Sequence, residues 1–297
     1  MSKSTLREKL QAGTFVMTAE ITPPLSANPQ DLIERGAPLK GLADAVNVTD
    51  GASARAHLES TIAAYLLLQT GVEPILQLTC RDRNRIALQS QLVGAAALGI
   101  VNVLSLTGDD PKKGDQPDAK PVFDLDSSAL IATAVSIRDK HQLPHGRAVA
   151  GTPDYFVGAA DAPVDPKEGW APTSLAKKIK AGAQFAQTQF CMDTGVLRRY
   201  TQRLAEHGLL DDFHLIVGVA PLASAKSARW IRDNLFGSII PDWIVDRLEG
   251  ASDAKAEGEA ICVSLLQEMK EIKGVSGAHI MAPLNEPAIA RVMAKMR

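Results

Sequence analysis

The amino-acid sequence predicts an α/β fold, a (β/α)8 TIM barrel that forms a single domain over residues 1–297. Eight strand-like apolar runs recur along the chain, with helix-like amphipathic segments between them. Several runs are continuously apolar, as in parallel strands that are covered on both faces. The first run leads into Glu20 and a Pro23-Pro24 pair and lacks the glycine-rich turn of a doubly wound sheet, so the barrel is favoured over that alternative.

The order of the elements follows from these runs. The predicted strands occupy residues 15–22, 45–49, 73–79, 102–108, 147–153, 184–190, 214–220 and 278–283. The predicted helices occupy residues 54–70, 83–98, 126–141, 173–181, 194–207 and 254–273. Most of these helices end at a glycine, which is typical of a helix C-terminus. An extra helical segment is expected near residues 237–253.

Two long loops interrupt the regular pattern. They span residues 110–125 and 153–171, and both follow predicted strands. Long loops in a compact domain are usually functional or mobile. Loops that follow the strands lie at the C-terminal face of a barrel, where barrel enzymes hold their active sites.

Composition excludes several classes of protein. A net charge of −2 and an aromatic content of 4% give no reason to expect a nucleic-acid partner. The chain shows no export signal, and no apolar run approaches the ~18 residues of a membrane span, so we expect no membrane partner. Cys80, Cys191 and Cys262 are widely spaced, which favours free thiols, no metal site and a cytoplasmic location.

Polar residues interrupt the apolar runs where the predicted strands end. They are Glu20, Thr49-Asp50-Gly51, Gln77, Thr79, Thr107-Gly108-Asp109, Gly151-Thr152, Gln189 and Asn285. Burial of polar groups without partners is unfavourable, so their convergence at one end of a barrel predicts a ligand site.

Two carboxylates are candidates for chemistry. Glu20 lies between apolar neighbours, which disfavour the charged form and suit a general acid. The alternative is an ion pair with an arginine across the barrel mouth. Asp109 follows Gly108, which permits close approach of a cofactor to the backbone. The alternative is a turn or capping aspartate, and that is the role we expect for Asp110.

The other polar candidates admit two interpretations each. Gln189 can donate and accept hydrogen bonds, which suits a heterocycle edge, or it can pair with a neighbour inside the barrel. The basic residues between Lys177 and Lys180 are expected either to form a solvated helix face or to bind a pyrophosphate. His57 and His279 are expected to be structural, because the histidines lack metal-ligand spacing.

Seven motifs, in the same order, resemble the methylenetetrahydrofolate reductase family, in its bacterial short form without a regulatory domain. The motifs are AEITPP (19–24), DAVNVTDGASAR (44–55), EPILQLTCRDRNR (73–85), GIVNVLSLTGDDP (99–111), AKPVFDLDS (119–127), GAQFAQTQFCMD (182–193) and GAHIMAPLNE (277–286). The resemblance implies a flavin-containing barrel that reduces 5,10-methylenetetrahydrofolate to 5-methyltetrahydrofolate. It implies a tetrahydrofolate substrate, FAD or FMN as cofactor, and NADH or NADPH as electron donor.

The resemblance also assigns roles to residues. Glu20 matches the general acid, Asp109 the acid beside flavin and pterin, and Gln189 the glutamine that contacts the pterin. The cofactor-binding positions implied in this way are Thr49, Gln77, Leu106, Thr107, Gly108, Asp109, Gly151, Ser174, Lys177 and Lys178.

The chain departs from the best-known bacterial pattern at four positions. Gln77 stands where that pattern has histidine, Thr107 where it has arginine, Gly151 where it has an aromatic residue, and Ala225 where it has phenylalanine. A second branch of the family resembles the chain here, and its members use FMN or an iron–sulfur partner subunit. The alternatives are therefore a flavin-independent or partner-dependent reductase subunit, and a folate-binding barrel methyltransferase. The resemblance also implies a homo-oligomer.

Overall fold

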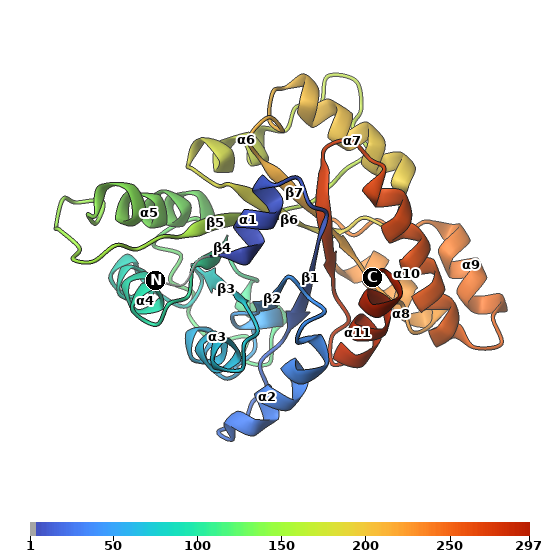
Figure 1. The fold of residues 1–297 in the computed structure, drawn as a ribbon, viewed down its shortest axis with the longest axis horizontal. Helices are drawn as coiled ribbons and strands as arrows, with labels where there is room; N and C mark the ends of the chain where they lie inside the picture. Colours follow the sequence, from blue (N-terminus) through green and yellow to red (C-terminus); the bar gives the residue numbers. More distant parts are fainter. Residues whose placement is uncertain (1–3) are drawn as a thin grey trace.

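The protein is a closed barrel of eight parallel strands, seen in a computed structural model that describes residues 4–297. The strands pair in chain order, and β8 closes the barrel on β1, so the predicted fold is confirmed (Figure 1). The strands are β1 (Val16–Ile21), β2 (Ala45–Val48), β3 (Pro74–Thr79), β4 (Asn102–Leu106), β5 (Phe156–Asp161), β6 (Phe185–Phe190), β7 (His214–Val219) and β8 (Val275–Ile280).

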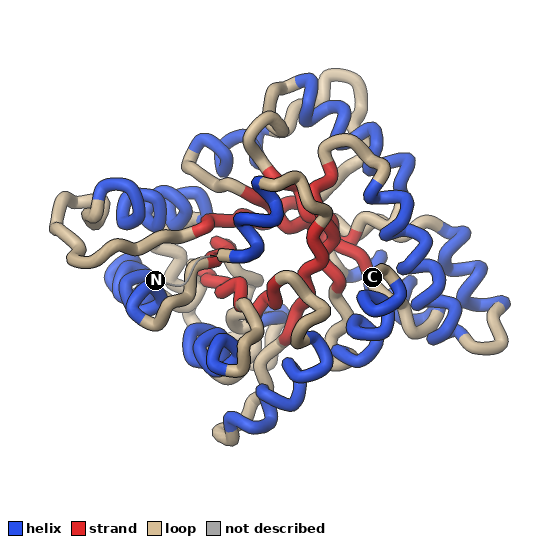
Figure 2. The backbone as a smooth tube through the Cα atoms, in the orientation of Figure 1, coloured by secondary structure: helices blue, strands red, loops and turns tan. Residues whose placement is uncertain are grey.

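Helices surround the barrel, so that the strands form the centre of the molecule (Figure 2). The α-helices are α1 (Thr5–Gln11), α2 (Pro29–Gly36), α3 (Ser60–Gln69), α4 (Arg85–Ala97), α5 (Ser127–Lys140), α6 (Thr173–Lys180), α7 (Thr194–Glu206), α8 (Ala225–Asn234), α9 (Asp242–Gly250), α10 (Ala254–Lys270) and α11 (Glu286–Lys295). Three short 3₁₀ turns are η1 (Ala37–Leu39), η2 (Ala52–Ala54) and η3 (Pro111–Lys113). The extra helix expected near 237–253 corresponds to α9.

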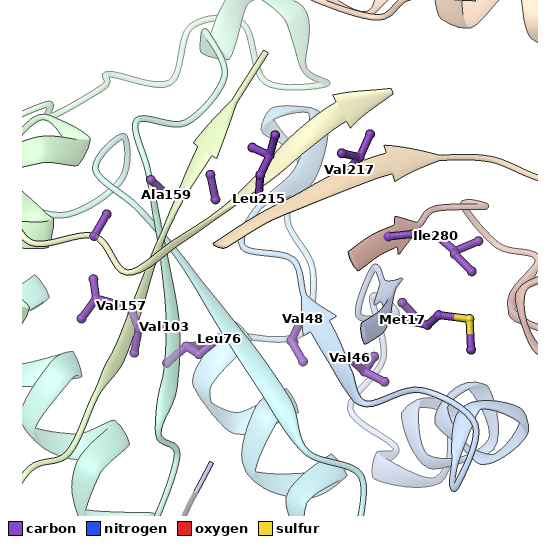
Figure 3. Packing of buried hydrophobic residues seen from close by; sticks show 14 of the residues in the cluster. Met17, Val46, Val48, Leu76, Val103, Val157, Ala159, Leu215, Val217 and Ile280 are labelled. Atoms are coloured by element: carbon purple, nitrogen blue, oxygen red, sulfur yellow. The ribbon is translucent and has the colours of Figure 1, made fainter. Parts of the chain in front are cut away.

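The main core lies between the strands and the helices. Every second strand residue points outward into it, because successive side chains of a strand face opposite sides. Figure 3 shows such residues on β1, β2, β3, β4, β5, β7 and β8, among them Met17, Val48, Leu76 and Val217. Burial of these side chains between two layers explains why the strand sequences are continuously apolar.

The other strand residues fill the inside of the barrel. Near the strand starts they are apolar, and Val16, Ile75 and Phe185 belong to one cluster with Leu6 and Leu10 of α1. Helix α1 lies across this N-terminal end of the barrel (Figure 1). The N-terminal end is therefore closed, and the C-terminal end is left for a site.

The fifth strand was predicted at the wrong place. Residues 147–153 form a loop after α5, where Ala148 makes an isolated antiparallel bridge with Gln142. The strand is Phe156–Asp161, inside the segment expected to be a long loop. Its sequence, FVGAAD, gives a weak strand signal because the barrel needs small residues here. A Cβ atom on Gly158 would overlap with the Phe185 ring.

This shift corrects the position of Gly151. The glycine precedes β5, and Asp154, between the two, forms a 2.7 Å ion pair with Arg7 of α1. Since α1 covers the N-terminal end of the barrel, Gly151 lies at the end opposite to Glu20, and it cannot belong to the same site. The last strand begins and ends earlier than predicted, at Val275 and Ile280. Asn285 therefore lies beyond the strand end, as the N-cap of α11.

Candidate active site

Glu20 lies on the inside of β1 near the open end of the barrel. Its Oε2 atom accepts a 3.2 Å hydrogen bond from Nε2 of Gln77 on β3. On the other side, Nε2 of His279 on β8 lies 3.5 Å from the same oxygen. No hydrogen bond from residues 4–297 reaches Oε1, and the side chain is 21% exposed. Glu20 is therefore fixed through one oxygen and can present the other to a ligand.

A buried polar layer lies directly below Glu20. Thr18 Oγ1 and His279 Nδ1 are 3.0 Å apart. Gln187 on β6 donates from Nε2 to Thr18 Oγ1 and to Asn47 Oδ1, at 3.0 Å each, and Asn47 returns a 2.6 Å bond to Gln187 Oε1. All four residues are at most 4% exposed. Four strands thus meet through side chains that satisfy one another, as buried polar groups must.

This layer fixes the orientation of the His279 ring. With the Gln187 amide donating to Thr18, the threonine hydroxyl is free to donate to Nδ1 of His279. The proton of a neutral imidazole is then on Nε2, which faces Glu20. The structural role expected for His279 is correct, and the ring also contacts the candidate acid.

The polar residues after β2 and on β3 form a second group. Asp50 Oδ2 accepts hydrogen bonds from Thr79 N at 2.7 Å and Thr79 Oγ1 at 3.0 Å, and it pairs with Arg83. Thr49 is 4% exposed, and its hydroxyl has no partner among the described residues. A buried hydroxyl without a partner is unusual and marks a place where a ligand can bind.

The loop after β4 places its two aspartates differently. Asp110 Oδ1 accepts a 3.0 Å bond from Lys112 N and caps η3, so its expected turn role is confirmed. Asp109 is exposed, and its carboxylate accepts no hydrogen bond from the part of the chain that is described. Leu106 is half-buried, Thr107 is exposed, and Gly108 has a φ of +97°. Asp109 is thus free to meet a ligand at the mouth.

Of the candidates on α6, Lys178 is the best placed. Its Nζ donates a 2.6 Å bond to Ala160 O near the end of β5, and burial lowers the pKa of its ammonium group. Burial also raises the pKa of the nearby Asp161 carboxyl, which accepts a 2.6 Å bond from Tyr200. Lys177 pairs instead with Asp126, the N-cap of α5, at 2.8 Å, and Ser174 is exposed on the first turn of α6.

Gln189 lies near the end of β6, where the pairing with β7 is irregular. Its Oε1 accepts a 3.1 Å bond from Phe190 N, while its amide nitrogen donates to no other described residue. The side chain is half-buried. Gln189 therefore retains donors for a ligand, whereas Gln187, two residues earlier, uses its amide inside the barrel.

A cleft of about 370 Å³ opens beside this mouth, over the ends of β2 and β3. Charged residues of both signs line it, including Asp50, Arg55, Glu59, Arg81 and Arg83. Most of them pair with one another, as Arg83 does with Asp50 and Arg81 with Asp82. The cleft extends the mouth toward the loops after β2 and β4.

Sequence reasoning missed the polar layer and the arginines. Thr18, Asn47 and Gln187 each lie two residues before a predicted site residue, on the same face of the strand. The period of two was the signal that could have revealed them. The arginines of the RDRNR segment (81–85) were not among the predicted site residues, yet Arg81 and Arg83 contact the site loops.

Two further features of the described chain bear on its chemistry. Burial raises the pKa of the Cys80 thiol to about 11, which makes it a poor nucleophile. Within residues 4–297, no cluster of His, Cys, Asp and Glu could hold a metal ion, and no helix is long and apolar enough to cross a membrane.

Comparison with known proteins identifies the family. Residues 5–297 match the family model described as methylenetetrahydrofolate reductase. The 5,10-methylenetetrahydrofolate reductases of Pectobacterium carotovorum and Escherichia coli are 25% and 26% identical over 241 residues, which are 79% of this chain and 73% and 74% of theirs.

A solved structure has the same fold. It is an uncharacterized protein from Clostridium thermocellum, described as binding two copies of 5-methyl-5,6,7,8-tetrahydrofolic acid. It superposes with a TM-score of 0.71 at 15% identity and covers 98% of both chains. The match over residues 5–297 shows that the chain belongs to the methylenetetrahydrofolate reductase family.

Proposed function

We propose that the protein reduces 5,10-methylenetetrahydrofolate to 5-methyltetrahydrofolate, with Glu20 as general acid and a bound flavin as hydride carrier. The observation that carries the proposal is the geometry of Glu20. One carboxylate oxygen is held by Gln77 and His279 above a satisfied polar layer, and the other is free at the barrel mouth. Family membership supplies the substrate class.

Glu20 acts on the bridge between the two folate nitrogens. Protonation of N10 breaks its bond to the methylene carbon and leaves a cationic iminium at N5. Addition of a hydride to that carbon then gives the N5-methyl group, so that one proton and one hydride are consumed. A general acid must reach the proton acceptor at hydrogen-bond distance, and the unpartnered Oε1 of Glu20 leaves one oxygen available for that contact.

We assign substrate contacts to Asp109, in the loop after β4, and to Gln189, on β6. An exposed carboxylate without a hydrogen-bond donor can lie near the iminium and stabilise its positive charge. The free amide donors of Gln189 can bond an acceptor on the edge of the pterin ring. The Clostridium protein with the same fold, described as binding 5-methyltetrahydrofolic acid, supports a folate in a barrel of this kind.

Three of the implied cofactor positions offer groups that fit a flavin. The unpartnered buried hydroxyl of Thr49 offers a hydrogen bond to a heterocycle. Gly108 is half-buried and has no side chain that would keep a cofactor from its backbone. Lys178 adds a positive charge for phosphate. When bound, FAD or FMN would take a hydride from NADH or NADPH and pass it to the substrate.

Three alternatives remain for the test. A partner-dependent reductase would need an iron–sulfur subunit as electron source, and a flavin-independent reductase would take the hydride directly from the nicotinamide. The family match favours reduction over a folate methyltransferase.

The test is anaerobic conversion of 5,10-methylenetetrahydrofolate, with 5-methyltetrahydrofolate separated and quantified by chromatography. NADH, NADPH and a dithionite-reduced viologen are supplied in parallel. Product with a nicotinamide supports a self-contained reductase, and product with the viologen alone indicates a partner subunit. No product with any donor would overturn the proposed reaction.

A further inference from the structure

We propose that Arg81 is a positioning residue that locks together the loops after β2 and β4 and thereby sets the place of Asp109 at the site. The inference rests on the proposed function for the role of Asp109. The lock itself is a property of the fold and can be measured without any turnover.

Arg81 lies just beyond β3, between the two loops, and its side chain is 5% exposed. Its Nη2 atom donates a 3.1 Å bond to Gly51 O in the loop after β2. Its Nη1 atom donates a 3.5 Å bond to Asp109 O in the loop after β4. Asp82 holds the guanidinium from a third side, accepting 2.7 Å bonds from Nε and Nη2. One rigid group thus joins both loops, as the planar guanidinium permits.

Two glycines bring the backbone of the loops against this side chain. A Cβ atom on Gly51 would overlap with Arg81 Nη2, and one on Gly108 would lie 2.8 Å from Arg81 Cβ. Both glycines have positive φ angles, of +58° and +97°. Any other residue would push the loops away from Arg81, so the glycines and the arginine form one structural unit.

The main chain around Arg81 anchors the long loop at both ends. Cys80 N donates to Leu106 O at 3.1 Å where the loop begins. Arg81 O accepts a 2.7 Å bond from Val122 N where the loop returns. Between these points the two loops touch, since a Cβ atom on Gly114 would overlap with Ala54 O. Main-chain bonds therefore fix both ends of the loop, and between them the Arg81 side chain holds the backbone at Asp109 O.

Charge adds to the geometry. Asp50, Asp82 and Asp109 all face the guanidinium, and the hydrogen bond to Asp82 is the main cause of the raised pKa of Arg81. Arg81 is thus permanently charged and places a positive charge beside Asp109. Arg83, two residues on, binds Asp50 and does not bond to Gly51 O or Asp109 O among the described contacts.

The first test measures hydrogen–deuterium exchange in the R81M, R81K and R247M variants. R247M removes an exposed ion pair with Glu257 on α9 and α10 and serves as the matched control. We expect amides of residues 51–58 and 107–124 to exchange about tenfold faster in R81M, and unchanged in R247M. R81K keeps the charge and can replace only one of the two carbonyl bonds, so we expect an intermediate increase. Unchanged exchange of both loops in folded R81M, or in R81K if R81M does not fold, would overturn the lock.

The second test asks whether Arg81 acts through Asp109. Turnover of methylenetetrahydrofolate is compared in R81M, D109N and the double variant R81M/D109N. The comparison is repeated with R81K in place of R81M. Relative to wild type, we expect R81M to lower kcat about tenfold. Relative to D109N, we expect the double variant to lower kcat by less than about twofold, because Asp109 is then already lost. An equal loss in both backgrounds would overturn positioning through Asp109. A wild-type protein without turnover would refute the proposed function, while the exchange experiment would still decide the lock.

Discussion

His279 Nε2 lies 3.5 Å from Glu20 Oε2, and the opposite nitrogen of the ring lies 3.0 Å from Thr18 Oγ1. The imidazole therefore links the candidate acid to the buried polar layer below it. Because the ring is 2% exposed and fixed on both sides, Glu20 has a defined position before substrate arrives.

Two substitutions of His279 separate these contacts. In H279Q the amide nitrogen can take the place of Nε2 beside Glu20. In H279N the shorter amide reaches only the place of Nδ1, where its oxygen can accept from Thr18. We expect kcat in H279N to be about tenfold lower than in H279Q, because the side chain that contacts Glu20 Oε2 is then lost. Steady-state turnover of both folded variants provides the measurement. Equal kcat values would show that His279 does not position Glu20.

Gln187 and Gln189 are expected to respond oppositely to replacement by leucine. Q187L leaves Asn47 and Thr18 without their buried partner, and we expect the free energy of unfolding to fall by about 3 kcal/mol. Q189L removes a half-buried amide whose one bond among the described residues is to Phe190 N, and we expect the free energy of unfolding to fall by less than about 1 kcal/mol.

The effects on the KM for methylenetetrahydrofolate should be reversed: we expect Q189L to raise KM more than Q187L does. Urea unfolding and initial rates measure the two quantities in the same preparations. A large loss of stability in Q189L without a change in KM would remove it from the substrate site.

Thr49 provides a test of the flavin site. The hydroxyl has no partner to lose among the described residues, so T49V should leave the unfolding free energy within about 0.5 kcal/mol of wild type. If the hydroxyl bonds a flavin, the Kd for FAD or FMN should rise about five- to tenfold in T49V. Flavin fluorescence quenching gives the Kd. The same affinity in both proteins would exclude Thr49 from the flavin contacts.

The Cys80 thiol gives a pH dependence whose sign follows from its burial. Its pKa is raised from 9.0 to about 11 in the folded protein, so it stays protonated there while the unfolded chain ionises. Its contribution to stability is complete below pH 9 and is lost as the pH rises toward about 11.

We expect the urea midpoint of wild type to fall over this range more steeply than that of C80A. The native thiol should also resist a disulfide reagent at neutral pH. Parallel slopes for the two proteins, or rapid labelling of Cys80, would contradict the assignment.

The sequence predicted the barrel because most strands are apolar runs between glycine-terminated helices. It failed at β5, where packing of the Phe185 ring requires Gly158 and small neighbours and so weakens the strand signal. Because of that error, Gly151 was predicted at the C-terminal end of the barrel, whereas it lies at the N-terminal end. The position of β5 depends on packing between residues that are far apart in the sequence, and a local sequence pattern does not reveal such packing.

The site was predicted in part. Polar residues at strand ends led to Glu20, Thr49, Gln77 and Asp109, which lie at the C-terminal mouth. The polar layer below them could have been read from the period of two along the strands. The role of Arg81 could not, because its contacts join loops that are far apart in the sequence.

The most direct test of the account is formation of 5-methyltetrahydrofolate by E20Q compared with wild type. The substitution keeps the size of the side chain and removes the carboxyl proton that Glu20 would donate as the proposed general acid. We expect turnover to fall by about 10²- to 10⁴-fold, the usual contribution of a general acid. D110N serves as the control and should retain wild-type activity, because Asp110 only caps η3. An E20Q protein that forms product at the wild-type rate would contradict the central claim.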